Sequence, residues 1–204
     1  AVCASHDGDA FLRVTLTAGP GPLGSNRGDL DPTLVVAARP GAVRTDPTDV
    51  LVVPWTRNER GPLAGVKSTS YGDNVVALVA AADVGAGEAL FANTRDELCE
   101  GTGSNVFVGF GTRLVTPSLD SGCLAGVTRE LMLEAGIGEE AVVPMSSLAD
   151  ASEMFLVSTG REVQPVRHVI SPDGRRSELP WCSGPFTVEA RRVWLEQIAP
   201  QHDP

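Results

Sequence analysis

The stretch GVKSTSYGDN, residues 65–74, separates two parts of the chain that follow different patterns. Before it, short valine-rich runs bounded by proline and glycine indicate β-strands. After it, an alanine-rich segment over 74–87 is apolar almost all round, stops at glycine and predicts a buried helix. The stretch also holds Lys67, the only lysine among sixteen basic residues, and Tyr71, the only tyrosine. The stretch therefore marks the change from strand to helix patterns, and it holds the chain's single lysine and single tyrosine.

Lys67 follows the apolar AGV and precedes STSY and the predicted helix, so we expect it in the interior or at a cleft. Arginine cannot replace lysine where a neutral amine is needed, because the guanidinium pKa is too high for it to lose a proton. A lone lysine in a chain that otherwise uses arginine fits a nucleophile or a Schiff-base former. Composition alone leaves a second interpretation open, a stray lysine without a special role.

The composition bounds the possible partners. The 204 residues suit one large domain or two small ones, and 42 % of them are apolar, enough for a core. A net charge of −10 argues against nucleic acid and against an anionic membrane surface. With no apolar run of membrane-spanning length and no signal segment at the start, we expect a cytoplasmic protein. An anionic ligand would need backbone N–H groups, helix N-termini or a few aimed arginines.

The cysteines and histidines do not form a recognisable metal pattern. The four cysteines are Cys3, Cys99, Cys123 and Cys182, and no pair has metal-ligand spacing or a histidine at zinc-site distance. We expect free thiols in a reducing compartment and no metal. A Ser-His-Asp site has no nucleophile-elbow motif to support it.

The local patterns predict an α+β protein. The predicted strands cover 12–19, 33–38, 49–54, 88–93, 105–110, 113–117 and 153–158. The segment 54–65 contains two prolines, two glycines and three charges. It predicts a linker at 55–64 between a small β-rich domain at 1–54 and a larger domain at 65–204.

Two further helices are predicted. In the segment 125–136, Val127, Leu131 and Ala135 share one face, and Gly136 is a suitable C-terminal cap. The segment 186–199 is an amphipathic helix. Its apolar side carries Ala190, Val193, Trp194 and Ile198.

Three segments contain groups that could bind a ligand. Glu100 precedes a Gly-Thr-Gly-Ser-Asn turn, where glycine lets a ligand approach the backbone, although this segment alone favours a surface glutamate in a solvated turn. Val127 and Thr128 follow Gly126 at a predicted helix start, which offers free N–H groups for an anion or serves packing only. Ser158 and Thr159 follow a predicted strand and precede Arg161. Their hydroxyl groups are a further set of hydrogen-bond donors in a turn.

Taken in order, these motifs resemble the class IV pyridoxal-phosphate aminotransferases, also called fold type IV. The matching segments, KSTSY, EGTGSNVF, TP, GCLAGVTRELMLEAG and EMFLVSTGREVQPV, span residues 67–166. The family includes branched-chain and D-amino-acid aminotransferases and 4-amino-4-deoxychorismate lyases. The resemblance implies a D-amino-acid aminotransferase-like α+β fold, with a partial small α/β domain and a larger β-pseudobarrel domain with flanking helices. It also implies pyridoxal 5′-phosphate as cofactor and a homodimer.

The resemblance further implies roles for individual residues. Lys67 forms the Schiff base with the cofactor and moves a proton between the substrate Cα and cofactor C4′. Tyr71 hydrogen-bonds the cofactor's phenolic oxygen, and Glu100 keeps the pyridine nitrogen protonated, as an opposite charge does. The other implied contacts are Leu124 on the ring, Val127, Thr128, Ser158 and Thr159 on the phosphate, and the turn Thr159, Gly160 and Arg161 on the substrate carboxylate.

One departure from the family concerns the start of the chain. Family members begin with further small-domain sequence, which supplies an arginine for the phosphate, and we expect such a segment to be missing here. The favoured function is transfer of an amino group between an amino acid and a 2-oxo acid. The alternative is a 4-amino-4-deoxychorismate lyase, although lyases often carry asparagine where this chain has Ser70. A minor alternative is an inactive, shortened protein of the same fold.

Overall fold

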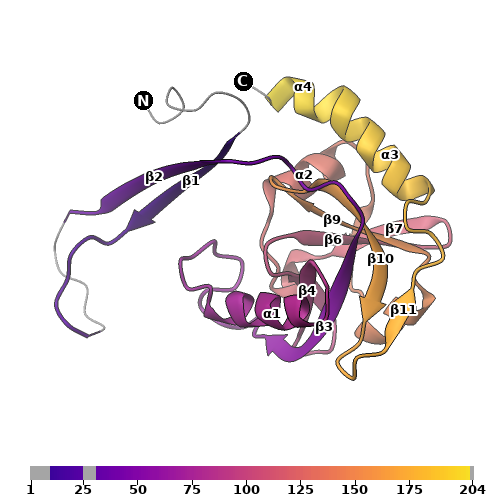
Figure 1. Cartoon of the computed structure of the whole chain (residues 1–204), viewed down its shortest axis with the longest axis horizontal. Helices are drawn as coiled ribbons and strands as arrows, with labels where there is room; N and C mark the ends of the chain where they lie inside the picture. Colours follow the sequence, from indigo (N-terminus) through magenta and orange to yellow (C-terminus); the bar gives the residue numbers. More distant parts are fainter. Residues whose placement is uncertain (1–9, 25–30, 203–204) are drawn as a thin grey trace. The chain divides into compact units, whose positions relative to one another are not determined.

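The computed structural model describes residues 10–24 and 31–202. The chain divides into two compact units, Ala1–Val43 and Arg44–Pro204. In the first unit, β1 (Ala10–Thr17) and β2 (Thr33–Pro40) form an antiparallel ribbon in a continuous register, which confirms both predicted strands (Figure 1). Cys3 lies outside the described residues, as does part of the loop between the strands.

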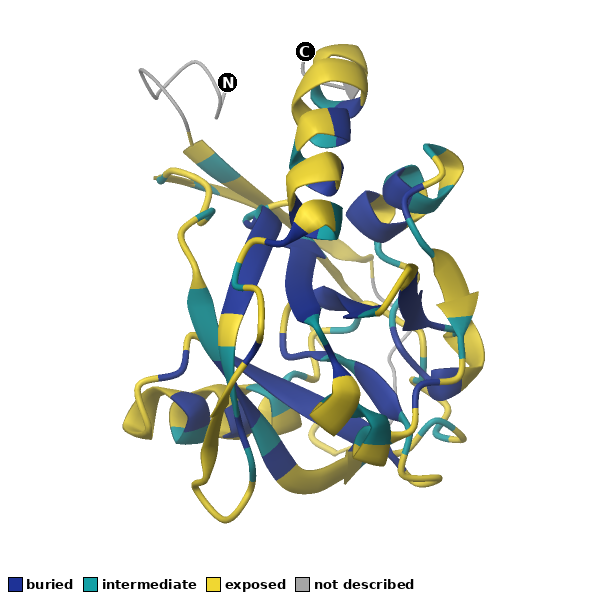
Figure 2. Cartoon of the chain, turned by 90° about the vertical axis from the view of Figure 1, so that its right-hand side faces the viewer, coloured by how far each residue is buried: buried dark blue, intermediate teal, exposed yellow. Residues whose placement is uncertain are grey.

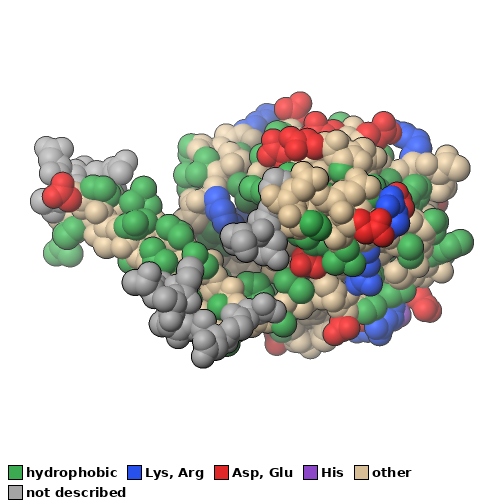
Figure 3. Space-filling model, turned by 90° about the horizontal axis from the view of Figure 1, so that it is seen from above, with side chains coloured by type: hydrophobic (Ala, Val, Ile, Leu, Met, Phe, Trp, Pro, Cys, Tyr) green, Lys and Arg blue, Asp and Glu red, His purple; other side chains and the backbone are tan. Residues whose placement is uncertain are grey.

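The β1–β2 ribbon exposes apolar side chains, and hydrophobic groups line it in the space-filling view (Figure 3). Those at least 39 % exposed are Leu12, Val14, Leu16, Leu34, Val35 and Val36. A two-stranded ribbon is at best marginally stable without a packing partner. Within the described residues, the buried core therefore belongs to the second unit.

The second unit is built on a mixed sheet, in the described residues a nine-stranded one, with the order β5-β4-β3-β10-β9-β6-β7-β8 and β11 added beside β10. The strands are β3 (Thr48–Arg57), β4 (Glu88–Asn93), β5 (Leu98–Gly101), β6 (Asn105–Phe110), β7 (Arg113–Pro117), β8 (Glu139–Ala141), β9 (Glu153–Ser158), β10 (Glu162–Ile170) and β11 (Arg176–Glu178). The predicted strands at 88–93, 105–110, 113–117 and 153–158 are confirmed.

The sheet curls until its two ends meet. The N–H of Leu98 in β5 donates to the carbonyl of Val143, just after β8, at 2.7 Å, and Glu97 forms a bridge with Pro144. The interior is apolar because alternate residues of each strand point inward. In β6 and β9 these are Val106, Val108, Met154 and Leu156. The predicted β-pseudobarrel is confirmed.

Helix α1 (Gly72–Asp83) connects the parallel strands β3 and β4 and covers the outside of the sheet. The helix is confirmed, but the expectation that it is buried on all sides is wrong. Ala77 and Ala81 are fully buried against the sheet, whereas Val75 and Val79 are more than half exposed. Alanine suits the buried side because its small side chain lets the helix backbone approach the strands closely.

Helix α2 (Val127–Glu134) is confirmed, and two of the three residues predicted to share its apolar face, Leu131 and Ala135, are half-buried against the core. Val127 is 69 % exposed, and the buried residues are Thr128, Arg129 and Met132. Arg129 can be buried because its guanidinium donates to the carbonyl of Pro117 at 2.8 Å and also pairs with Glu140. Gly136 has a φ of +78° and follows the last helical turn, as a C-terminal cap requires.

The C-terminal helical segment consists of α3 (Pro185–Val193), a π-helical turn (Trp194–Ile198) and α4 (Ala199–His202). Ala190, Val193 and Ile198 are buried, and Trp194 is half-buried, so the predicted apolar side is confirmed. Figure 2 shows this segment with its buried residues on one side and exposed residues on the other. Its buried side covers the outward-facing Phe107 and Phe155, whose rings stack 5.0 Å apart.

The division of the chain differs from the predicted domain boundaries. The strand predicted at 49–54 is part of β3, which pairs with β4 and β10 in the sheet of the second unit. The chain divides after Val43 instead of after residue 54, and the predicted linker at 55–64 begins inside β3. Valine-rich sequence predicts a strand but not the sheet that the strand joins.

Among the described helices, none has the length and hydropathy that a bilayer crossing requires. In residues 10–24 and 31–202, no group of three or more histidine, cysteine, aspartate or glutamate side chains could hold a metal ion. Cys99, Cys123 and Cys182 are free thiols.

Candidate active site

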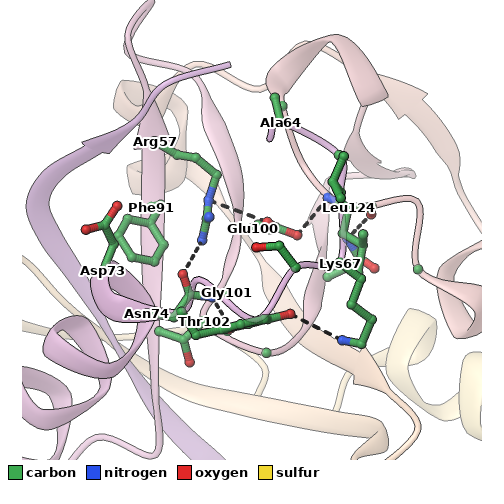
Figure 4. Close-up of a pocket in the computed structure, with 18 of the residues that line it drawn as sticks. Arg57, Ala64, Lys67, Asp73, Asn74, Phe91, Glu100, Gly101, Thr102 and Leu124 are labelled. Atoms are coloured by element: carbon green, nitrogen blue, oxygen red, sulfur yellow. Dashed lines mark hydrogen bonds and ion pairs between the residues drawn. The ribbon is translucent and has the colours of Figure 1, made fainter. Parts of the chain in front are cut away.

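A cavity of about 770 Å³ opens in the second unit (Figure 4). Its lining comes from the end of β3 and the loop after it, the start of α1, Phe91 of β4, β5 with the turn after it, the loop that leads into α2, and the end of β9. Its volume is typical of a small-molecule site. Segments distant in the sequence meet here because the curled sheet brings the ends of β3, β5 and β9 to one side.

The cavity brings together most of the side chains that the motifs singled out. They are Lys67, Tyr71, Glu100, Leu124, Val127, Thr128, Ser158 and Thr159. Gly160 and Arg161 are not among the residues that line it. Gly160 accepts a backbone hydrogen bond from Arg44, and the Arg161 side chain is buried behind the turn.

Lys67 is exposed within the loop that precedes α1, and it lines the cavity, so the expectation of a cleft position is confirmed. Its Nζ donates to the Tyr71 hydroxyl at 3.3 Å and lies 5.8 Å from the ring centroid. The loop is folded locally, because the N–H of Ser70 donates to the Ser68 hydroxyl at 3.2 Å. The chain's single lysine and single tyrosine therefore form a pair at the cavity.

Glu100 projects from β5, with 12 % of its side chain exposed. One carboxylate oxygen accepts the N–H of Leu124 at 2.9 Å, and the other lies 3.4 Å from Nε of Arg57. Burial raises the pKa of Glu100, while the Leu124 N–H and the charges of Arg57 and Lys67 act against this rise. The nearby Glu88 carboxylate adds to it. A positively charged partner in the cavity would therefore stabilise the ionised form of Glu100.

Sequence analysis missed two residues of this site, Arg57 and Asn74. The guanidinium of Arg57 lies over the Phe91 ring, 4.5 Å from its centroid, and Nη2 donates to Asn74 Oδ1 at 3.2 Å. Asn74 in turn donates to the carbonyl of Thr102, as Figure 4 shows. A single arginine in a linker-like segment gave no signal in the sequence. Asn74 belongs to the quoted stretch, two positions inside α1.

The loop before α2 is fixed by Leu124. Its N–H donates to Glu100, and its carbonyl accepts the side-chain amide of Asn105 at 2.9 Å. Gly126 follows at the helix N-cap, where a Cβ atom would lie only 2.0 Å from Asn105 Oδ1. Glycine is therefore required by the close approach of Asn105.

The start of α2 provides donors for an anion. No side chain caps its first turn, and Val127 and Thr128 line the cavity. The first N–H groups of a helix carry partial positive charge and lack partners within the helix. Hydroxyls of Ser158 and Thr159 line the same cavity from the end of β9. This arrangement can hold an anionic group with few basic residues.

Two buried cysteines near the site are poorly suited to catalysis. Cys99 and Cys123 flank Glu100 and Leu124 in the sequence and are buried. Burial raises the pKa of both thiols, so neither is a thiolate near neutral pH.

The curled mixed sheet with a lysine, a tyrosine and a glutamate around one cavity defines a protein of the fold type IV class. A family model for amino-transferase class IV matches residues 2–169, and the chain belongs to this family.

Relatives and solved structures agree with this result. The chain is 30 % identical over 135 residues to a branched-chain-amino-acid aminotransferase of Pseudomonas aeruginosa, an alignment that covers 64 % of this chain and 42 % of that protein. The branched-chain amino acid aminotransferase of Thermobaculum terrenum, in a mutant form, superposes with a TM-score of 0.85 at 28 % identity, covering 98 % of this chain and 67 % of that one. Another structure of the Thermobaculum terrenum enzyme, with a TM-score of 0.77, is a holo form with PLP.

A candidate 4-amino-4-deoxychorismate lyase of Legionella pneumophila superposes with a TM-score of 0.78 at 24 % identity, which shows the shared fold alone. The chain spans between 29 and 60 % of the length of the first four curated relatives that it matches.

Proposed function

We propose that this protein is a pyridoxal 5′-phosphate-dependent aminotransferase that moves an amino group between an amino acid and a 2-oxo acid. One observation carries the proposal. The Lys67–Tyr71 pair, the Glu100 carboxylate and the uncapped start of α2 line a single cavity. Family membership supports it.

The residues present fit the cofactor's functional groups. Its aldehyde requires an amine, its phenolic oxygen a hydrogen-bond donor, its ring nitrogen a carboxylate and its phosphate a set of N–H and hydroxyl donors. Lys67, Tyr71, Glu100 and the start of α2 supply these groups in turn. When bound, the cofactor supplies an electron sink for the carbanion that forms when the substrate loses its Cα proton.

The chain's own groups then have distinct tasks. Lys67 holds the cofactor covalently and afterwards moves the proton at the substrate Cα. Tyr71 orients Lys67 and the phenolic oxygen. Glu100 keeps the ring nitrogen protonated by its negative charge. Val127 and Thr128 bind the phosphate at the helix start, with Ser158 and Thr159 opposite them.

The substrate carboxylate is the remaining partner of the Thr159–Gly160 turn. Thr159 lines the cavity, and we propose that backbone groups of this turn contact the carboxylate. The Arg161 side chain is committed to a buried ion pair with Glu88, so we do not give it this task.

The proposal is tested by titrating the purified chain with pyridoxal 5′-phosphate and following the visible absorbance of the bound cofactor. Reduction with borohydride should leave the cofactor on the peptide that contains Lys67, and Lys67→Arg should abolish both signals. Amine transfer from branched-chain L-amino acids to 2-oxoglutarate is the first assay, because relatives carry that name. A Lys67→Arg variant that retained amine-transfer activity would contradict the proposal.

A lyase reaction would use the same cavity and the same cofactor. Ser70 lines this cavity, at the position where lyases often carry asparagine. Pyruvate release from 4-amino-4-deoxychorismate, measured beside amine transfer, distinguishes the two reactions.

The assembly and compartment are part of the proposal. We propose a homodimer in the cytoplasm, on the strength of the family resemblance and of the free thiols in the described residues. Light scattering on the eluting protein measures the mass against the 21.3 kDa of one chain, and cell fractionation tests the compartment.

A further inference from the structure

Arg57 makes three contacts at the end of β3, each with a different part of the cavity. Its guanidinium stacks over Phe91 of β4, its Nε lies 3.4 Å from a Glu100 oxygen, and its Nη2 donates to Asn74 of α1. The side chain is 23 % exposed. A flat ion whose face lies on a ring, and whose edge faces one carboxylate and donates one hydrogen bond to an amide oxygen, has little freedom to turn.

Glu100 is held from two directions. Arg57 approaches one carboxylate oxygen and the Leu124 N–H donates to the other. The charged groups that act on Glu100 are Arg57 from β3, Lys67 from the loop before α1, and Glu88 from β4. In the part of the chain that the structure describes, Arg57 is the side chain that forms an ion pair with Glu100.

The contacts of Arg57 continue through Asn74. Asn74 accepts from Arg57 and donates to the carbonyl of Thr102, so it bridges the start of α1 and the turn that follows Glu100. The loop that carries Lys67 and Tyr71 ends at this same helix start. Arg57 therefore connects the Lys67 loop with the Glu100 strand, although it belongs to neither.

We propose that Arg57 is a positioning residue, which holds the Glu100 carboxylate ionised and aimed into the cavity and ties it to the Lys67 loop through Asn74. The inference rests on the proposed function, because it concerns the carboxylate that would face the cofactor's ring nitrogen. Lysine cannot replace Arg57 fully, since one ammonium cannot stack on Phe91, pair with Glu100 and donate to Asn74 at the same time.

The first measurement needs no cofactor. Infrared spectra of the chain across pH, compared with those of Glu100→Gln, give the pH at which Glu100 takes up a proton. In Arg57→Met this midpoint should rise by about one pH unit, a tenfold change in the protonation equilibrium. Arg57→Lys should restore part of the shift. Arg60→Met removes an arginine that is 78 % exposed in the loop directly after β3, and Glu100 should titrate in it as in the unmodified chain.

The second measurement uses the loaded protein. Arg57→Met should bind pyridoxal 5′-phosphate about tenfold more weakly, and the absorbance of the bound cofactor should change with pH at a different midpoint. Circular dichroism verifies folding, and Arg57→Gln replaces Arg57→Met if the latter does not fold.

An unchanged Glu100 midpoint in a folded, uncharged Arg57 variant would overturn the inference, whatever the cofactor binding. If the unmodified chain binds no cofactor, the proposed function fails, whereas the infrared titration still decides the role of Arg57.

Discussion

The carboxylate of Glu88 lies 3.1 Å from the guanidinium of Arg161, and the two side chains are 0 and 10 % exposed. Glu88 also accepts the N–H of Thr102 at 3.0 Å and the hydroxyl of Ser104 at 2.9 Å. Arg161 donates to the carbonyl of Gly87 at 3.0 Å. The pair thus joins the turn after β5 to the turn after β9, from behind the cavity.

Arg161→Leu should therefore destabilise the fold strongly. It leaves the Glu88 carboxylate buried without its cation, which costs about 3–5 kcal/mol when one partner of a buried pair is removed. Urea unfolding measures the loss of free energy. Arg167→Leu is the control, because Arg167 is exposed on β10, the strand that begins directly after Arg161. Equal losses for the two variants would mean that the Glu88–Arg161 pair has no particular structural role.

Glu59 gives the fold a dependence on acid pH. Its carboxylate accepts the hydroxyl and the N–H of Thr94, at 2.7 and 3.1 Å, and pairs with Arg95 at 3.0 Å. The bonds from Thr94, followed by the charge of Arg95, hold the pKa of Glu59 at about 2, below its usual value of 4.5. A lowered pKa contributes stability above the unfolded-state value, and this stability is lost as pH falls from 4.5 towards 2.

Glu59→Gln should accordingly lower the melting temperature at pH 7, and the difference from the unmodified chain should shrink below pH 4.5 and vanish near pH 2. Thermal unfolding at a series of pH values measures this. Glu130→Gln, at an exposed position of α2, serves as the control for the loss of one surface carboxylate. A Glu59→Gln deficit that persisted unchanged at pH 2 would refute the assignment.

Sequence patterns predicted the strands in which apolar residues alternate or follow one another between turn residues, and they missed strands whose polar residues and proline break that pattern. The largest failure is β10, a central strand that contains Pro165, Arg167 and His168. Its pairing with β9 ends at Pro165, and its pairing with β3 begins at Val166. Proline is tolerated where pairing shifts, but a local pattern cannot reveal such a switch between partners.

For the site, the motifs identified many of the residues that line the cavity, but not Arg57 and Asn74, which line it too. Glu100 precedes a glycine-rich turn and Thr128 follows Gly126 at a helix start, so their neighbours in the sequence point to a ligand. Arg57 and Glu88 act through contacts with residues far along the chain, and nothing near them in the sequence reveals these partners. The same limit explains Arg161, which was expected at the substrate and is instead paired with Glu88.

Gly126→Ala should disturb the start of α2. The added methyl would meet Asn105 Oδ1 at 2.0 Å, so Asn105 must move and its bond to the Leu124 carbonyl is strained. Overpacking of this kind costs about 1–3 kcal/mol. We expect that loss in urea unfolding, together with weaker binding of pyridoxal 5′-phosphate.

Gly72→Ala is the control for this change. A Cβ there meets nothing within 4 Å, and alanine favours the helix that begins at this position. Cofactor binding as tight in Gly126→Ala as in the control would show that the start of α2 does not contact the phosphate.

A substitution at Glu153 should lower the stability of the fold without changing cofactor binding. Its carboxylate is 1 % exposed and accepts the N–H of Phe186 at 3.1 Å and the N–H and hydroxyl of Thr187 at 2.9 and 2.7 Å, at the start of α3. Glu153→Gln replaces one acceptor oxygen by a donor that faces these donors, and an unsatisfied buried group costs about 1–3 kcal/mol. Because Glu153 does not line the cavity, the affinity for pyridoxal 5′-phosphate should stay unchanged while urea unfolding shows the loss. Weaker cofactor binding at unchanged stability would instead place α3 in contact with the site.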